Sequence, residues 1–183
     1  MKLGQIVIEK IMEGRKVVIR HLDEDDVEPM RHFINKLSKE KTFITFQGEQ
    51  ISLEDEQKYV REIIKKIESS TTVKLVLMVD GQVVGTTEIS LGVRTHSHVG
   101  GLGLSVDSSV RGMGLGRLLL ETVISEAKKE LNGLRIIELT VFAINEVAIS
   151  LYKSFGFREV GRFPEKISYK GNYVDEIIMC LEV

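Results

Sequence analysis

The sequence of 183 residues predicts one mixed α/β domain. Strand-like runs rich in β-branched residues alternate with runs in which apolar residues recur at helical spacing. The length suits a single domain over residues 1–183, and no linker or low-complexity tract divides it. Hydrophobic residues make up 43% of the chain and charged residues 28%, as expected of a globular protein with a core.

The N-terminal half is expected to contain two hairpins separated by two helices. Residues 4–22 and 72–92 read as strand pairs around turns at Glu13–Gly14 and Asp80–Gly81. A helix should follow the acidic run 23–26, because acidic side chains stabilise a helix N-terminus. A second helix is expected over 55–69, capped by Ser52 or Asp55.

The C-terminal half is expected to alternate strands and helices. A polar connection leads to a strand over 100–106 that contains glycines, and a helix follows over 115–130. A strand rich in β-branched residues over 134–143 precedes a helix that Asn145 could cap. Gly156 fits a left-handed helix end, and a short hairpin around Lys170–Asn172 leads to a last strand over 174–181.

Charge and composition exclude several classes of protein. The net charge of −2, without a block of like charge, disfavours nucleic acid as the main partner. No secretory signal or apolar run of about 20 residues occurs, so we expect a cytoplasmic protein without a membrane partner. The single cysteine, Cys180, fits a reducing compartment and reads as a small buried residue rather than a nucleophile. No metal-binding cluster is expected.

The stretch SVRGMGLGRLLLE, Ser109 to Glu121, places three glycines between a strand and a helix. Glycines let the backbone approach a ligand, and the free N–H groups of the first helical turn attract an anion. The dinucleotide fingerprint and the P-loop both fail, because Arg117 stands where each requires a glycine counted from Gly112. The stretch therefore predicts another kind of phosphate site, R-x-x-G-x-G, and the alternative is a plain tight turn.

A second motif follows this glycine loop by about 30 residues. Its members match N-x-x-A-x-x-x-Y-x-x-x-G-F at every position: Asn145, Ala148, Tyr152, Gly156 and Phe157. With both motifs, the sequence resembles the GNAT superfamily of N-acetyltransferases, which use acetyl-CoA. The resemblance covers roughly residues 15–182, leaving 1–14 as an N-terminal strand extension, and the closing hairpin is similar to that of spermidine and ribosomal-protein alanine acetyltransferases. It implies a mixed, mostly antiparallel, twisted sheet with helices on both faces, splayed at the cofactor site.

The resemblance also implies where acetyl-CoA binds. The pyrophosphate would sit on the backbone amides of the glycine loop, and the pantetheine arm would lie along the strand ending at Val106. In the family this strand separates from the next one, 135–143, which frees backbone amides for the ligand. The implied cofactor-binding residues are Leu104, Ser105, Val106, Arg111, Gly112, Met113, Gly114, Leu115, Gly116, Arg117, Asn145, Ala148 and Tyr152.

Two catalytic residues follow from the resemblance. Tyr152 would donate a proton to the departing thiolate, a nearly balanced transfer because a thiol has a pKa of ~8.5 and a tyrosine of ~10. An acceptor amine with a pKa of ~10.4 must lose a proton, and Glu88 is expected to take it, directly or through water. Because side chains alternate along a strand, Glu88 is expected on the same face as Val84. That face is either the wall of a cleft or exposed to solvent. His96 and His98 titrate near neutrality but are expected to be exposed.

The sequence therefore predicts an acetyl-CoA-dependent N-acetyltransferase that acts by direct attack in a ternary complex. Its acceptor would be a small amine such as a polyamine, or a protein N-terminal amine. Acidic residues of the segment 45–55 could attract either acceptor, and a solvated acidic loop is the simpler reading. The alternatives are a non-catalytic module that binds or senses coenzyme A and, more distantly, a nucleotide-binding domain. Family members often form homodimers, so a homodimer is also an expectation of the resemblance.

Overall fold

The computed structural model describes residues 2–183, which pack as two compact units. The first unit contains the chain through Ser90 together with Gly103–Asn132, and the second contains Leu91–Leu102 together with Gly133–Val183. Strand β5 (Val99–Val106) is divided between the units: it belongs to the second unit up to Leu102 and to the first unit from Gly103. The assignment of residues 1–183 to one domain stays a prediction.

The first unit contains two hairpins and three long helices among the described residues. Its strands are β1 (Ile6–Met12), β2 (Arg15–His21), β3 (Thr72–Val79) and β4 (Gln82–Leu91). Its helices are α1 (Val27–Glu40), α2 (Leu53–Glu68) and α3 (Leu115–Glu130), with single 3-10 turns at Glu24–Asp26 and Ser108–Val110. The predicted turns at Glu13–Gly14 and Asp80–Gly81 are confirmed, because all four residues have φ between 49° and 82°.

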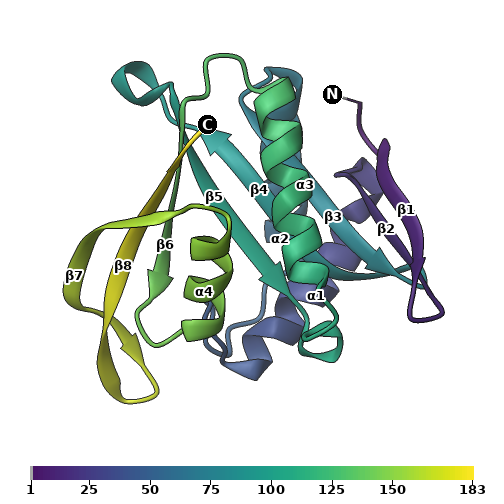
Figure 1. Ribbon diagram of the computed structural model, residues 1–183. Coiled ribbons are helices and arrows are strands. Elements are labelled where there is room, and N and C mark those ends of the chain that lie inside the picture. Colours follow the sequence, from purple (N-terminus) through teal and green to yellow (C-terminus); the bar gives the residue numbers. More distant parts are fainter. Residues whose placement is uncertain (1) are drawn as a thin grey trace. The chain divides into compact units, whose positions relative to one another are not determined.

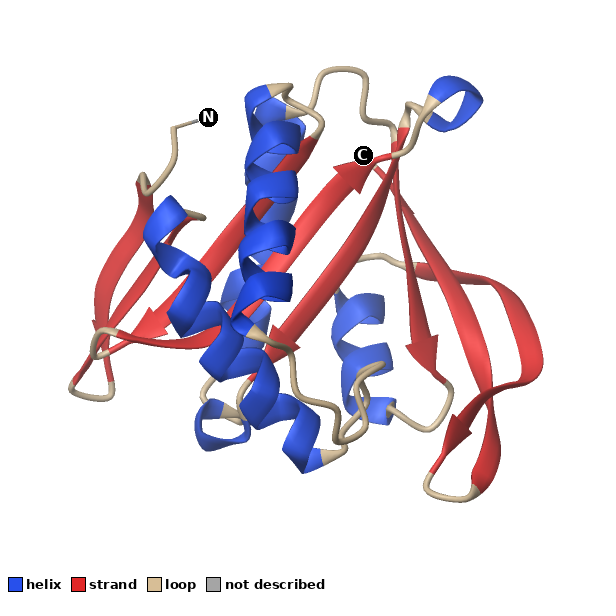
Figure 2. Ribbon diagram, turned by 180° about the vertical axis from the view of Figure 1, so that it is seen from behind, coloured by secondary structure: helices blue, strands red, loops and turns tan. Residues whose placement is uncertain are grey.

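Helices cover both faces of the strands of the first unit. In Figure 1, α3 lies on the near face of β3 and β4, and α1 and α2 lie on the far face; Figure 2 shows the same strands from behind. The side chains that join α1 and α2 to the sheet form one buried apolar cluster: Leu22, Met30, Val60, Ile63, Ile64, Ile67 and Val76. Because side chains alternate along a strand, Lys74 on β3 faces α1 and α2 like Val76, and so does its ladder partner Glu88 on β4.

One detail of β4 differs from the simple alternation expected from the sequence. The ladder between β3 and β4 pairs Leu77 with Gly85 but Met78 with Val83, so the register shifts by one residue at Val84. An extra residue in one strand reverses the side-chain direction beyond it. Val83 packs against the cluster of α1 and α2, and the simple alternation that assigned Val84 to the face of Glu88 does not continue through this bulge.

The second unit contains the remaining strands and one helix. They are β6 (Ile136–Phe142), β7 (Arg158–Tyr169), β8 (Asn172–Glu182) and α4 (Glu146–Ser154), together with a 3-10 turn at Arg94–His96. The parallel ladder between β5 and β6 ends after three residue pairs, the last being Gly101 with Glu138. The closing hairpin has strands of 12 and 11 residues, so the expectation of a short hairpin is wrong. Cys180 on β8 is a free thiol and only half-buried.

The eight strands found along residues 2–183 are hydrogen-bonded in the order β1-β2-β3-β4-β5-β6-β8-β7. The pairs β1–β2, β2–β3, β3–β4, β6–β8 and β7–β8 are antiparallel, whereas β5 and β6 pair in parallel. The predicted mixed, mostly antiparallel sheet is confirmed. Along residues 2–183, no helix is both long enough and apolar enough to cross a bilayer.

Candidate active site

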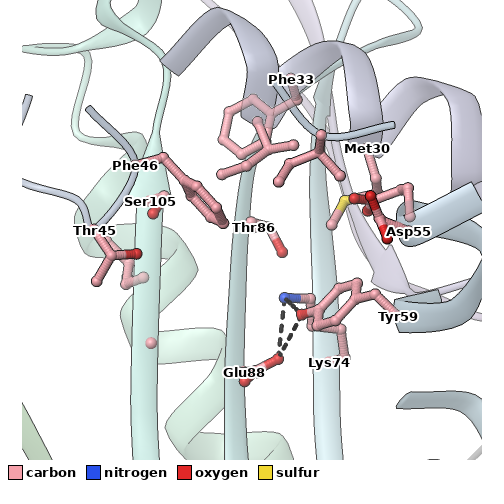
Figure 3. Close-up of a pocket in the computed structure, with 15 residues that line it drawn as sticks. Met30, Phe33, Thr45, Phe46, Asp55, Tyr59, Lys74, Thr86, Glu88 and Ser105 are labelled. Atoms are coloured by element: carbon pink, nitrogen blue, oxygen red, sulfur yellow. Dashed lines mark hydrogen bonds and ion pairs between the residues drawn. The ribbon is translucent and has the colours of Figure 1, made fainter. Parts of the chain in front are cut away.

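A cavity of about 470 Å³ lies in the first unit, and its wall comes from both helices and strands. Helix α1 and the segment after it contribute apolar side chains, namely Met30, Phe33, Ile34, Phe46 and Ile51. The remaining lining residues are mostly polar: Thr45, Asp55, Glu56, Tyr59, Lys74, Thr86, Glu88, Gly103, Leu104 and Ser105. Figure 3 shows the polar groups of α2, β3 and β4 opposite the ring of Phe33. Such a mixture of apolar walls and a few polar groups is typical of a small-molecule site.

Three polar side chains form a connected cluster inside this cavity (Figure 3). Lys74 Nζ donates to Glu88 Oε2 at 3.1 Å and to Tyr59 Oη at 3.0 Å. The Tyr59 hydroxyl donates to the same Glu88 oxygen at 3.1 Å. The side chain of Lys74 is 6% exposed and that of Glu88 is 28% exposed, so this is a largely buried ion pair.

The ion pair holds both partners in their charged forms. Burial favours the neutral form of Glu88, but Lys74 and the two hydrogen bonds outweigh it and hold the pKa of Glu88 below its ordinary value. Burial likewise favours neutral Lys74, but Glu88 and Tyr59 outweigh it and raise the pKa of Lys74. Burial raises the pKa of Tyr59, so its hydroxyl keeps its proton near neutrality. Glu88, the predicted proton acceptor, therefore lies in the cavity as a stabilised and weakly basic carboxylate.

The glycine loop has the backbone geometry of an anion site. Gly112 and Gly114 have φ of 83° and 75°, a region in which residues with a side chain are strained. A Cβ at either position would meet no atom within 4 Å, so open space adjoins the backbone there. Gly114 is the N-cap of α3, and no side chain caps this helix. The N-terminus of this 16-residue helix, where the dipole is positive, therefore has backbone N–H groups that an external anion can bind.

Side chains from α1 hold the segment that leads into this loop. Arg111 donates to Glu40 at 2.9 Å and to the carbonyl oxygen of Val106 at 3.1 Å, and Ser108 donates to Glu40 at 2.7 Å. Asp107 accepts from the Ser109 amide and pairs with Lys36 at 2.6 Å. The predicted phosphate-binding arginine is therefore engaged by a carboxylate of α1.

The loop and the strand before it fit coenzyme A. Positive φ at two glycines, open space beside them and an uncapped helix suit a pyrophosphate, and Arg111 adds a positive charge. Leu104 and Ser105, two of the predicted cofactor-binding residues, line the cavity. Gly116 and Arg117 lie in the first turn of α3, Leu115 is buried beneath it, and Met113 is half-buried. Within the described residues, no group of His, Cys, Asp or Glu could hold a metal ion.

The second predicted motif lies in the second unit. Asn145 caps α4, because its side chain accepts from the Ala148 amide at 3.2 Å. Gly156 has φ of 90°, as a left-handed helix end requires. Tyr152 is 7% exposed and packs on Phe157 with ring centroids 5.7 Å apart. Burial raises the pKa of Tyr152 to about 12, so proton transfer to a thiolate is less balanced than the sequence suggested.

The other predicted candidates are exposed, make local hydrogen bonds or, in the case of Asp55, line the cavity. His96 and His98 are exposed, as expected. Ser52 caps α2 by accepting from the Asp55 amide at 3.1 Å, and Asp55 lines the cavity. The Glu49 carboxylate accepts from the amide of Gln47, and backbone hydrogen bonds hold the pKa of Glu49 below its ordinary value.

Sequence reasoning missed two charged residues of the cavity, Lys74 and Glu56. Lys74 stands alone in the apolar run TVKLVLMV, which was a usable signal, since a lysine is rarely buried without a partner. Glu56 precedes Val60 and Ile63 by four and seven residues, so it occupies the apolar stripe of α2. A charged residue in either position marks a polar site inside the fold.

Residues 32–157 match the acetyltransferase (GNAT) family. An L-amino acid N-acetyltransferase of Escherichia coli K12 is 37% identical over 110 residues, which cover 58% of this chain and 66% of that protein. A ribosomal protein bS18 alanine N-acetyltransferase of Escherichia coli K12 is 38% identical over 80 residues, which cover 44% of this chain and 53% of that protein. The chain thus spans just under two-thirds and about half of the lengths of these relatives.

The fold is also similar to solved structures. A crystal structure of an acetyltransferase of the GNAT family from Streptococcus pneumoniae matches with a TM-score of 0.83 and 26% identity. The match covers 91% of this chain and 99% of that chain. Two further structures with this fold, at 14% and 20% identity, contain coenzyme A and acetyl-CoA respectively.

Proposed function

The chain belongs to the acetyltransferase (GNAT) family, and on that premise we propose that it is an acetyl-CoA-dependent N-acetyltransferase. The acceptor would be the α-amine of an amino acid or of a protein N-terminus, as the names of its two relatives suggest. When bound, acetyl-CoA supplies the acetyl thioester.

The continuity of one strand with the anion loop is the observation that carries the proposal. Leu104 and Ser105 of β5 line the cavity, and the chain then runs through a single 3-10 turn into Arg111 and the glycines before α3. A ligand with its phosphates at the helix N-terminus could therefore follow β5 and reach the cavity with its other end. Coenzyme A has this extended shape, with a pyrophosphate near one end and a thiol at the other.

The cavity favours a cationic acceptor with an apolar substituent. Its described lining carries three carboxylates, Asp55, Glu56 and Glu88, against one ammonium, Lys74. The excess negative charge attracts an amine in its ammonium form. The apolar wall from α1, which includes Phe33, would exclude water around an aliphatic or aromatic side chain. A polyamine, the alternative acceptor, would meet the carboxylates but gain little from this wall.

Residues of the chain would act in a direct transfer from donor to acceptor. A carboxylate of the cavity would take a proton from the ammonium, and Glu88 is the candidate that the resemblance implies. Tyr152 would donate to the leaving sulfur. No acyl-enzyme is required, and the half-buried Cys180 is paired in the ladder of β6, β7 and β8 rather than in the cavity lining.

Two assays test the proposed function. Acetyl-CoA should raise the melting temperature of the protein, whereas NAD and ATP at equal concentration should not. Thiol release from acetyl-CoA should then depend on an added amino acid, peptide or polyamine. Stabilisation by acetyl-CoA without thiol release for any amine would favour the non-catalytic module that binds coenzyme A. Absence of any stabilisation by acetyl-CoA would refute the proposal.

A further inference from the structure

Glu56 is the least expected residue of the cavity wall. It lies on the stripe of α2 that faces the sheet, with Val60, Ile63 and Ile67 following at four, seven and eleven residues, and all three are buried. The residue itself is 5% exposed. A carboxylate in an apolar stripe costs stability unless it is paired, so its position calls for a partner.

No partner for the Glu56 carboxylate is found among residues 2–183. No hydrogen bond or ion pair reaches it, and only the more distant charges of Lys74 and Arg31 act on it. It is instead part of the cavity lining. Its place in the first turn of α2 favours a negative charge there, because the positive end of the helix dipole is near. The structure thus holds a carboxylate without a hydrogen-bond partner, on a mostly buried residue, in the lining of a cavity that fits a cation.

Glu88 differs from Glu56 in the one respect that matters for binding an ammonium. Its Oε2 already accepts from Lys74 and from Tyr59, so the negative charge of Glu88 is already balanced by a buried ammonium. We infer that Glu56, rather than Glu88, binds the ammonium group of the acceptor and removes its proton. This inference rests on the proposed function and names the residue that performs one step of it.

The charged surroundings of Glu56 agree with this role. Burial raises the pKa of Glu56, and Lys74 of β3 and Arg31 of α1 reduce that effect. The other titratable groups at the cavity are Asp55 and Tyr59 of α2 and Glu88 of β4. A carboxylate with a raised pKa is the better base, because its conjugate acid lies closer to the ammonium in proton affinity.

The proposed step balances as follows. Glu56 accepts one proton from R–NH3⁺, which gives R–NH2 and the neutral carboxylic acid. The amine lone pair then forms a bond to the thioester carbonyl carbon, and the carbon–sulfur bond breaks with its electron pair on sulfur. The second proton lost from nitrogen balances the one that sulfur gains to become the thiol of coenzyme A. Glu56 afterwards releases its proton to solvent, so the products are the amide, the thiol and one proton.

Binding of a simple amine tests the ammonium site without any turnover. We would titrate 2-phenylethylamine, an ammonium with an apolar ring, into the protein saturated with coenzyme A, by calorimetry. The expected result is that Glu56→Gln weakens its binding at least tenfold, whereas the neutral 2-phenylethanol binds both proteins alike. Glu62→Gln, on the exposed side of α2, is the matched control and should bind like the wild type. No binding of 2-phenylethylamine to the wild type, or equal binding to Glu56→Gln, overturns the inference.

The pH dependence of turnover separates the two carboxylates. With an acceptor found in the thiol-release assay, Glu56→Gln should lower kcat/KM for the acceptor at least 100-fold and leave the KM for acetyl-CoA within twofold. The acid limb of the wild-type pH profile should be missing in Glu56→Gln and present in Glu88→Gln. The reverse pattern would return the role of the base to Glu88.

Misfolding and failure of the proposed function are both recognisable. Glu56→Gln keeps the shape of the side chain and removes a buried charge, so its melting temperature at pH 8 should equal or exceed that of the wild type. If the wild type neither binds acetyl-CoA nor releases thiol, the proposed function fails. The amine titration, repeated without coenzyme A, still decides whether Glu56 binds an ammonium.

Discussion

Replacing Lys74 by methionine should destabilise the fold in a way that depends on pH. The substitution keeps the apolar stem but leaves the Glu88 carboxylate buried without its ion-pair partner. Removing one partner of a buried pair costs about 3–5 kcal/mol. Because the Glu88 side chain is 28% exposed, water reaches it in part, and we expect a loss near the lower end, about 3 kcal/mol.

The sign of the pH effect follows from the two states of Glu88. In the wild type its lowered pKa means that its contribution to stability is present at neutral pH and is lost only as the pH falls through that lowered value. In Lys74→Met burial dominates and the pKa rises, so the variant regains stability as the pH falls from neutral toward the ordinary value of about 4.3. The deficit against the wild type should therefore shrink between pH 7 and pH 5.

Urea unfolding followed by circular dichroism measures this deficit. The double variant Lys74→Met, Glu88→Gln removes both charges and should recover most of the loss, since replacing a whole buried pair is often nearly neutral. Lys58→Met, at an exposed position of α2, controls for the change of residue type and should shift stability by less than about 0.5 kcal/mol. A Lys74→Met deficit under about 0.5 kcal/mol at pH 7, or one equal at both pH values, would refute the reasoning.

Three further predictions concern the cofactor and the leaving group. Tyr152→Phe should lower kcat roughly 100-fold with an unchanged Kd for acetyl-CoA, and unchanged turnover would remove this tyrosine as the acid. Gly114→Ala should strain a backbone with φ of 75° by about 1–2 kcal/mol and weaken acetyl-CoA binding in calorimetry. Gly133→Ala, with φ of 83° outside the loop, should cost similar stability but leave binding intact, so equal affinity in both variants would contradict a phosphate role for the loop. Glu40→Gln should tighten acetyl-CoA binding a few-fold, because it removes a carboxylate that occupies Arg111; weaker binding would instead mean that Glu40 positions the arginine.

Features set by local sequence were predicted well. Helix α3 runs over the predicted Leu115–Glu130, because the glycines before it and the leucine repeat define its start and its apolar face. The N-cap at Asn145 and the turn at Asp80–Gly81 also depend on a few adjacent residues, and both are confirmed. For Glu88 the sequence left a cleft wall and a solvated face open, and the structure places it in the cavity lining.

Features that depend on register or on distant partners were not predictable in the same way. The shifted register at Val84 arises in the ladder with β3, which adjacent residues do not encode. The contact of Arg111 with Glu40 joins residues 71 positions apart. The ion pair of Lys74 with Glu88 could be predicted only with the register of the β3–β4 hairpin. The pair changes the chemistry expected of Glu88, because Lys74 already balances the charge of its carboxylate.

Mass spectrometry of the acceptor tests the central claim most directly. The protein would be incubated with acetyl-CoA and a mixture of free amino acids, peptides with apolar N-terminal residues, and spermidine. The proposed function predicts protein-dependent acetylation of an α-amine, with fragment ions that place the acetyl group on that nitrogen. If acetyl-CoA binds but no amine becomes acetylated, the proposed function is contradicted. If spermidine alone becomes acetylated, the acceptor is a polyamine rather than an α-amine.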